Sequence, residues 1–179
     1  MGRFKDLLIL FFLVILTNFC AYSYLTHSRN TWQLPVRNAV LSSDAKDHKR
    51  RNAALAWDLT VPYGTPVYPV RAGKVIYAGC NNAGGYGCWV WIDHGDGWES
   101  VYAHLIQGSI QVIKGQHVTS YTILGEVGWT GKTTFGPHVH LEIRYQGRQV
   151  DPKEVFGDPK ELGLVYRRFY SIPTRQPSR

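Results

Sequence analysis

The sequence lacks several features that would define its class directly. It has no internal repeat and no low-complexity block, which excludes a repeat array and argues against a disordered chain. Beyond an N-terminal apolar run it also lacks a long stretch with the 3.6-residue period of an amphipathic helix. Only 3 of the 179 residues are cysteine, and they do not form two closely spaced pairs, which argues against a cysteine-based zinc site.

The composition is nevertheless rich enough for one packed core. Hydrophobic residues make up 44% and aromatic residues 13% of the chain, which fits one domain with extensions. Basic residues outnumber acidic ones, 20 against 13, so the net charge is +7 and the pI is about 9.4. Such a surface attracts polyanions, which include nucleic acid, anionic lipid head groups and acidic cell-wall polymers.

The N-terminus indicates export. Arg3 and Lys5 precede an apolar run over residues 7–16, and a weaker apolar segment continues to Leu25. The strongly apolar part has the length of a signal peptide, and the full stretch is long enough for a signal anchor in the inner membrane. We therefore expect residues 1–25 to be a signal peptide or signal anchor, and the remainder to be periplasmic, inner-membrane anchored or secreted. Export argues against nucleic acid as a partner, and the chain contains no recognised nucleic-acid motif.

Short apolar segments separated by glycine and proline predict a mainly β domain. Their spacing is typical of an antiparallel β fold with two sheets. Helical structure is expected only as a turn around 152–156 and as a short helix at 159–167. The expected strands are 54–61, 66–70, 73–78, 88–93, 99–104, 117–119, 123–127 and 138–145.

The chain divides into four expected parts. Residues 1–25 form the export segment, and residues 26–46, with little periodicity, form an irregular linker. The β domain occupies residues 47–157. Residues 158–179 are expected to be a short helix followed by a loose basic tail.

Two of the cysteines, Cys80 and Cys88, flank a turn-rich segment between two expected strands. A hairpin at this point would bring the two sulfur atoms within bridging distance, and an exported compartment permits a disulfide. We therefore predict a disulfide between Cys80 and Cys88, and two free thiols are the alternative.

Two histidines near the end of the domain, His138 and His140, lie two residues apart in an expected strand. Because successive side chains of a strand alternate between faces, both imidazoles point the same way and can converge on one metal ion or one reacting bond. The pair alone also fits a polar patch on an exposed strand. His104, at the end of another strand, and Asp58, at the start of the domain, extend the pair to a constellation.

These residue types suit a zinc hydrolase. Zinc in such enzymes is commonly held by three His or carboxylate ligands, with a fourth position open for water. Asp58 and His140 would supply two of the ligands. The metal lowers the pKa of water from about 15.7 to about 7 and polarises the scissile carbonyl. His104 and His138 would then act as general base and as donors to the oxyanion.

Short motifs accompany these residues along the domain. They are Asp58, Gly64-Thr65-Pro66-Val67, Ala72-Gly73-Lys74-Val75, Asp93-His94-Gly95-Asp96-Gly97, Tyr102-Ala103-His104-Leu105, Gly115-Gln116, Gly128-Trp129-Thr130-Gly131, Gly136-Pro137-His138-Val139-His140-Leu141-Glu142 and Asp151-Pro152. In this order, and over more than half of the chain, they resemble the lysostaphin and LytM-type zinc endopeptidases, which cut peptide bonds in bacterial peptidoglycan. The resemblance implies a two-sheet antiparallel β fold with a narrow groove, zinc ligands Asp58 and His140, and catalytic His104 and His138.

One position departs from the commonest pattern of this family, which has a ligand histidine four residues before the ligand aspartate. Here that position is Ala54. We predict that His48, ten residues before Asp58 in a polar segment, folds back over the first strand and supplies the third ligand. The alternative is a solvated His48 in a basic loop.

The sequence therefore predicts a Zn2+-dependent endopeptidase with metal ligands His48, Asp58 and His140, acting on peptidoglycan cross-links or stem peptides. Keeping His104 and His138 in the same cleft argues against a decayed site, because buried polar groups without partners are costly. The alternative is a degenerate member that binds the cell wall or activates an amidase without cutting. The bond that is cut and the oligomeric state are not predicted.

Overall fold

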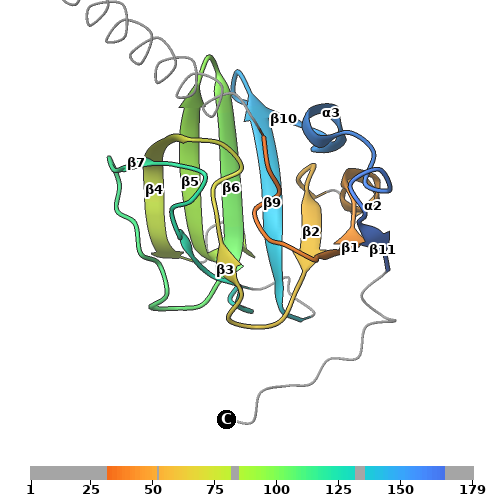
Figure 1. Cartoon of the computed structure of the whole chain (residues 1–179), viewed down its shortest axis with the longest axis horizontal. Coiled ribbons are helices and arrows are strands. Elements are labelled where there is room, and N and C mark those ends of the chain that lie inside the picture. Colours follow the sequence, from red (N-terminus) through yellow and green to blue (C-terminus); the bar gives the residue numbers. More distant parts are fainter. Residues whose placement is uncertain (1–31, 52, 82–84, 132–135, 168–179) are drawn as a thin grey trace, which may run out of the picture. The chain divides into compact units, whose positions relative to one another are not determined.

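Strands that alternate between core-facing and outward-facing side chains build the domain around one large sheet (Figure 1). The computed structural model describes residues 32–51, 53–81, 85–131 and 136–167. Within these residues the large sheet has nine strands, in the order β11-β1-β2-β9-β6-β5-β4-β7 with β10 also paired to β9. They are β1 (Val40–Ser43), β2 (Trp57–Thr60), β4 (Gly73–Asn81), β5 (Gly87–Gly95), β6 (Trp98–Leu105), β7 (His117–Val118), β9 (His138–Tyr145), β10 (Arg148–Val150) and β11 (Val165–Tyr166).

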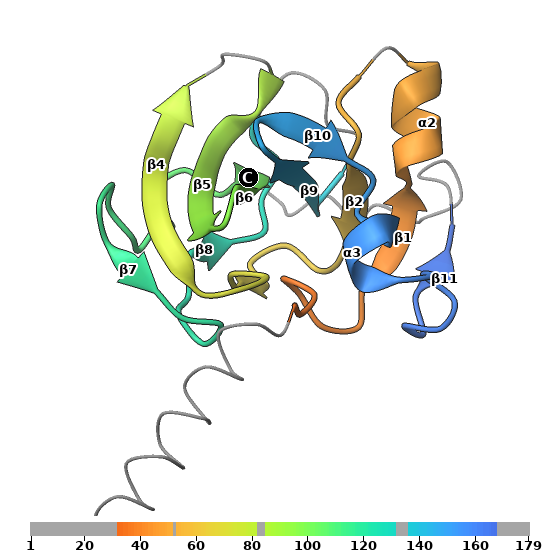
Figure 2. The same cartoon turned by 90° about the horizontal axis from the view of Figure 1, so that it is seen from above.

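A second, smaller sheet pairs β3 (Pro66–Val67) with β8 (Gly125–Glu126). The described residues also contain two short helices, α2 (Ala45–Arg50) and α3 (Lys153–Phe156). Figure 2 shows both helices toward the β1–β2 side of the large sheet, with β7 at its other side. The mainly β fold expected from the sequence is confirmed.

Most of the expected elements are present. Each of the eight expected strands overlaps an observed strand, and the turn expected around 152–156 contains α3. All neighbouring strands in the large sheet are antiparallel except β1 and β11, which run parallel. The large sheet is therefore mixed rather than purely antiparallel.

The helix expected at 159–167 is wrong. Residues 159–163 form turns, and Gly163 has a φ of 71°, a left-handed conformation that ends them. Leu164 then packs into the core at 6% exposure, and the next residues extend as β11. Pairing with β1, where Val165 lies opposite Val40, replaces the expected helix.

The segment expected to be an irregular linker is structured where the chain is described. Residues 40–43 form β1, and Val36, Ala39 and Leu41 are buried in the hydrophobic core. The apolar residues of this segment are spaced too irregularly to reveal a strand, yet they cover one end of the core. The expected export segment, 1–25, and most of the basic tail lie outside the described residues. None of the helices in the described part of the chain is long and apolar enough to cross a membrane.

Strand β9 separates the core from the opposite face of the large sheet. Val139, Leu141 and Ile143 are fully buried and belong to the core. Because strand side chains alternate, His138 and His140 project from the other face. The register of the sheet thus fixes where these two histidines lie.

Candidate metal centre

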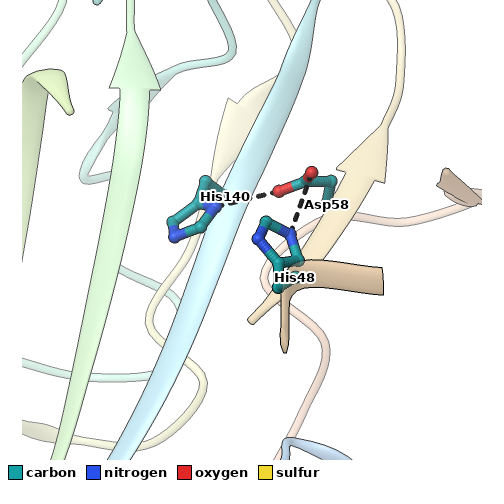
Figure 3. A group of neighbouring side chains, drawn as sticks. All are labelled: His48, Asp58 and His140. Carbon is teal, nitrogen blue, oxygen red and sulfur yellow. Dashed lines mark hydrogen bonds and ion pairs between the residues drawn. The ribbon is translucent and has the colours of Figure 1, made fainter. Parts of the chain in front are cut away.

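Three side chains converge beside β9 (Figure 3). Asp58 lies on β2, directly opposite His140 on β9, and His48 comes from α2. One ligand atom of each residue lies within 4.8 Å of the others, and all three residues are buried. The two nitrogen donors and one carboxylate oxygen form the donor set that zinc commonly takes in hydrolases.

Helix α2 brings His48 to this group. Asp44 caps the helix by accepting a hydrogen bond from the backbone N–H of Asp47 at 2.8 Å. Ala45 and His48, three residues apart, are the buried residues of the helix. His48 therefore faces the sheet, although the sequence of the helix is mostly polar.

The imidazole of His48 is buried and has few partners for its ring nitrogens. Its Nε2 lies 3.0 Å from Oδ2 of Asp58. Neither ring nitrogen, however, has a well-aligned hydrogen bond to any other described residue. Buried polar atoms need partners, and a metal ion between His48, Asp58 and His140 would give Nε2, the nitrogen that faces Asp58, a ligand bond. The residues present therefore fit a zinc ion.

His140 is held between two carboxylates. Its Nδ1 lies 2.9 Å from Oδ1 of Asp58, and its Nε2 lies 3.2 Å from Oε1 of Glu142. Burial lowers the pKa of His140, but the two carboxylates outweigh burial and raise it to about 9. Burial likewise raises the pKa of Asp58, and the adjacent His140 and His48 outweigh it, so that this pKa lies well below its usual range. The centre thus strongly favours positive charge next to Asp58, from a proton or from a metal ion.

His104 and His138 lie beside this group, with 4.8 Å between their ring centroids. Nδ1 of His104 lies 2.8 Å from the carbonyl oxygen of Thr130, and Nδ1 of His138 lies 2.8 Å from that of Gly136. Since a carbonyl only accepts, both Nδ1 atoms must carry the proton, and in each neutral ring the basic lone pair is therefore on Nε2. Burial lowers the pKa of His104 to about 3 and also lowers that of His138, so both rings are neutral.

The backbone around His104 is tightly constrained. His104 has a φ of 66°, a left-handed conformation that is uncommon for a residue other than glycine and recurs at functional sites. A Cβ on Gly131 would lie 2.2 Å from the carbonyl oxygen of Gly85 and 3.1 Å from Nδ1 of His104. Thr130 bridges the strands, because its Oγ1 accepts from the N–H of Cys88 at 2.9 Å and donates to the carbonyl of Leu105 at 2.7 Å. Close backbone packing therefore sets the position of the His104 ring.

All five residues predicted to form the site lie close together in the structure. Two other histidines of the described residues lie elsewhere: His94 is buried against Ser100 and Ala72, and His117 is exposed on β7. Glu142 lies in the last of the histidine-containing motifs, for which the sequence predicts no role at this position. Its contact with His140 follows from the i, i+2 spacing on one face of β9.

The hairpin between β4 and β5 lies next to the candidate metal centre. Cys80 and Cys88 are paired across the two strands and form the predicted disulfide. The segment between them carries Tyr86, whose ring centroid lies 5.9 Å from that of His140. No pattern in the sequence indicates a role for Tyr86.

Known proteins share this arrangement of sequence and fold. The sequence profile of a family described as Peptidase family M23 matches residues 53–152. DD-carboxypeptidase/endopeptidase Mpg of Neisseria meningitidis serogroup B is 40% identical over 105 residues, which cover 59% of this chain and 23% of that protein. The chain thus matches about a quarter of that relative's length, 23%.

Solved structures give the same result. A protein of Pseudomonas aeruginosa assigned to peptidase M23 is 36% identical, with a TM-score of 0.60, and the match covers 71% of this chain and 50% of that chain. A zinc-containing peptidase from Vibrio cholerae is 27% identical, with a TM-score of 0.55, over 69% of this chain and 39% of that chain.

Proposed function

Because the chain belongs to peptidase family M23, we propose that it is a zinc-dependent endopeptidase that hydrolyses peptide bonds in the cross-links or stem peptides of bacterial peptidoglycan. The observation that carries the proposal is the convergence of His48, Asp58 and His140, with ligand atoms within 4.8 Å of one another. A family member that had lost its metal would have no physical reason to keep these buried polar groups together. A relative in Vibrio cholerae that is 39% identical over 94 residues is named peptidoglycan DD-endopeptidase ShyA, which supports peptidoglycan as the substrate.

His48, Asp58 and His140 would hold the metal. When bound, zinc supplies Lewis acidity, which activates water and polarises a carbonyl near neutral pH. Nδ1 of His140 is the nitrogen that faces Asp58, at 2.9 Å, and it would be the ligand atom, whereas Nε2 stays protonated toward Glu142.

His104 and His138 would carry the proton transfers. Their Nδ1–H groups are committed to backbone carbonyls, so each Nε2 is a base that can accept the proton of the attacking water. After protonation the same nitrogen can donate to the oxyanion or to the leaving amine. The strained backbone of His104 holds this ring in place before substrate binds.

Metal analysis and muropeptide release test the proposal together. The full-length wild-type protein should contain about one zinc per chain, as expected for a three-ligand site, and should release muropeptides from purified peptidoglycan. His140→Ala should abolish both zinc binding and release, while His117→Ala, at an exposed histidine on β7, should change neither. Release at the wild-type rate by His140→Ala would refute the proposed mechanism.

A second candidate function follows from Ala54, which occupies the position where most family members have a ligand histidine. In that case the domain would bind the cell wall, or activate an amidase, without cutting. Complementation of a deletion strain by a His104→Ala, His138→Ala double variant separates the two functions. Full complementation supports the binding function, and loss of function by a folded, zinc-loaded double variant supports the enzyme.

We further propose that the protein acts in the cell envelope, with the apolar segment 1–25 directing export or anchoring the chain in the inner membrane. Fractionation of cells that express the full-length chain would show it in the periplasmic or membrane fraction. Recovery in the cytoplasmic fraction alone would contradict this location.

A further inference from the structure

Tyr86 contacts the two halves of the candidate site with different parts of the same residue. Its backbone carbonyl oxygen accepts a hydrogen bond from the N–H of His104 at 3.0 Å. Its hydroxyl donates a hydrogen bond to Oε1 of Glu142. Burial, together with the negative charge of Glu142, raises the pKa of Tyr86, so the phenol keeps its proton and remains a donor.

Glu142 transmits the second contact to His140. The carboxylate is fully buried, and its Oε1 lies 3.2 Å from Nε2 of His140. Its Oε2 accepts hydrogen bonds from Nη2 of Arg144 at 2.8 Å and from Nε2 of Gln149 at 3.0 Å. The guanidinium of Arg144 in turn lies 4.9 Å from the ring centroid of Trp91. Each oxygen of Glu142 is therefore fixed from a different side, and the carboxylate has a defined position.

The orientation of His140 depends on this carboxylate. With Nε2–H directed at Glu142, the ring must present Nδ1 to Asp58, which is the orientation that the candidate metal centre requires. If Glu142 moved, the ring could turn or exchange tautomers, and the ligand atom would be lost. A group that fixes the position of Glu142 therefore also fixes, indirectly, the orientation of the His140 ring.

From these contacts we propose that Tyr86 is a positioning residue that sets His140 relative to His104, through its hydroxyl and Glu142 on one side and through its carbonyl on the other. The inference rests on the proposed function only in taking His140 as a metal ligand. Tyr86 is not a catalytic residue, because its polar atoms are used by Glu142 and His104.

Two contacts within the β4–β5 hairpin hold Tyr86 in this position. The disulfide between Cys80 and Cys88 closes the segment that contains Tyr86. The ring of Tyr86 also packs against Trp89, with 5.3 Å between ring centroids. The disulfide restrains the backbone of Tyr86, and the contact with Trp89 restrains its side chain.

The test is Tyr86→Phe in the full-length protein, which removes the hydroxyl and keeps the ring. The affinity for Zn2+, measured by competition with a chelator, should fall about tenfold, within the 10–100-fold range typical for a residue that holds a metal ligand. The visible absorption spectrum of the Co2+-loaded variant should also differ from that of the wild type, because the ligand field at the metal would change.

Tyr77→Phe is the matched control. The hydroxyl of Tyr77 accepts a hydrogen bond from Asn81. Its ring stacks on Trp89 at 4.0 Å, and Tyr77→Phe keeps this contact, so the control removes a hydroxyl of the same hairpin that does not bind Glu142. The control should bind Zn2+ like the wild type. Equal losses of affinity in the two variants, or no loss and an unchanged Co2+ spectrum in Tyr86→Phe, would overturn the proposal.

A second variant covers the case in which Tyr86→Phe does not fold. Glu142→Gln keeps the shape of the side chain that Tyr86 holds, and it should also weaken Zn2+ binding, whereas unchanged binding would overturn the proposal. Zinc binding by the wild type distinguishes a failure of this proposal from a failure of the proposed function. A wild type that binds no zinc contradicts the proposed function, whereas a zinc-binding wild type matched by Tyr86→Phe contradicts only the role of Tyr86.

Discussion

Nδ1 of His140 on β9 lies 2.9 Å from Oδ1 of Asp58, its direct partner on β2. The two strands are hydrogen-bonded neighbours, so the register of the sheet, rather than a loop, sets the geometry of this pair. His48 joins the pair from α2, outside the sheet. Its contribution is therefore the part of the centre that most needs a direct test.

Replacement of His48 by alanine should remove one metal ligand. We expect the affinity for Zn2+ to fall by more than about 100-fold, beyond the effect typical of residues that only support a ligand. Equilibrium competition with a chelator measures the loss on the full-length protein. His117→Ala, at an exposed histidine, is the control, and zinc content unaffected by His48→Ala would exclude His48 as the third ligand.

Gly131→Ala should displace the ring of His104. Its Cβ would lie 2.2 Å from the carbonyl oxygen of Gly85 and 3.1 Å from Nδ1 of His104, and the residue has a φ of 98°. We expect a loss of stability of more than about 2 kcal/mol, the upper end of the cost of a left-handed conformation, because a steric clash is added. Urea unfolding and muropeptide release measure the two effects.

Gly147→Ala is the matched control for that variant. Gly147 also has a positive φ, 75°, but a Cβ there would meet no atom within 4 Å. The free energy of unfolding of the Gly147→Ala variant should fall by about 1 kcal/mol, the cost of the left-handed backbone conformation alone, and its activity should stay unchanged. Equal effects of the two substitutions would show that close packing at Gly131 is unimportant.

Removal of the disulfide should affect both stability and catalysis. The crosslink joins residues separated by 8 positions, and closing so short a loop stabilises a fold by about 2–3 kcal/mol. Cys88 also donates its N–H to Thr130, whose carbonyl holds His104. We expect Cys80→Ser, Cys88→Ser to melt at a lower temperature and to release muropeptides more slowly. A reductant should lower the melting temperature of the wild type and leave the double variant unchanged; the same response in both proteins would contradict this role.

The stability of the protein should fall in acid partly because of His94. Burial lowers the pKa of His94 from 6.5 to about 4. The unfolded chain therefore binds this proton first as the pH falls, so the contribution of His94 is complete above pH 6.5 and is lost toward pH 4. The loss between pH 7 and pH 4.5 should be roughly 2–3 kcal/mol.

Urea unfolding of the wild type and His94→Gln at these two pH values isolates this term. Other titrating groups contribute to both proteins, so they cancel in the comparison. The wild type should lose more stability than the variant on acidification. An identical pH dependence of the two proteins would show that His94 does not titrate in this way.

Local patterns in the sequence were sufficient for the central strands. The alternation in β9 places His138 and His140 on one face, and that period survives folding because one face of the strand is buried. Helix α2 was missed because it has only 6 residues, of which only Ala45 and His48 are buried, so its sequence carries no apolar period. Its fold-back over the sheet was nevertheless the predicted route for His48.

Contacts that depend on distant pairing could not be predicted from such patterns. Tyr86 and Glu142 are 56 residues apart, and their hydrogen bond exists because β6 lies between β5 and β9 in the sheet. In the same way, Val165 and Tyr166 form a strand because β1 offers a free edge, not because their own sequence requires one.

The position of α2 has a practical consequence for how the domain is delimited. The match to the family covers residues 53–152, whereas α2 spans Ala45–Arg50. A fragment cut at the family boundary would keep the whole matched region, including Asp58 and His140, but would lack His48. Such a fragment would also lack β1 and the core residues Val36, Ala39 and Leu41, so a negative activity assay on it would say nothing about the intact protein.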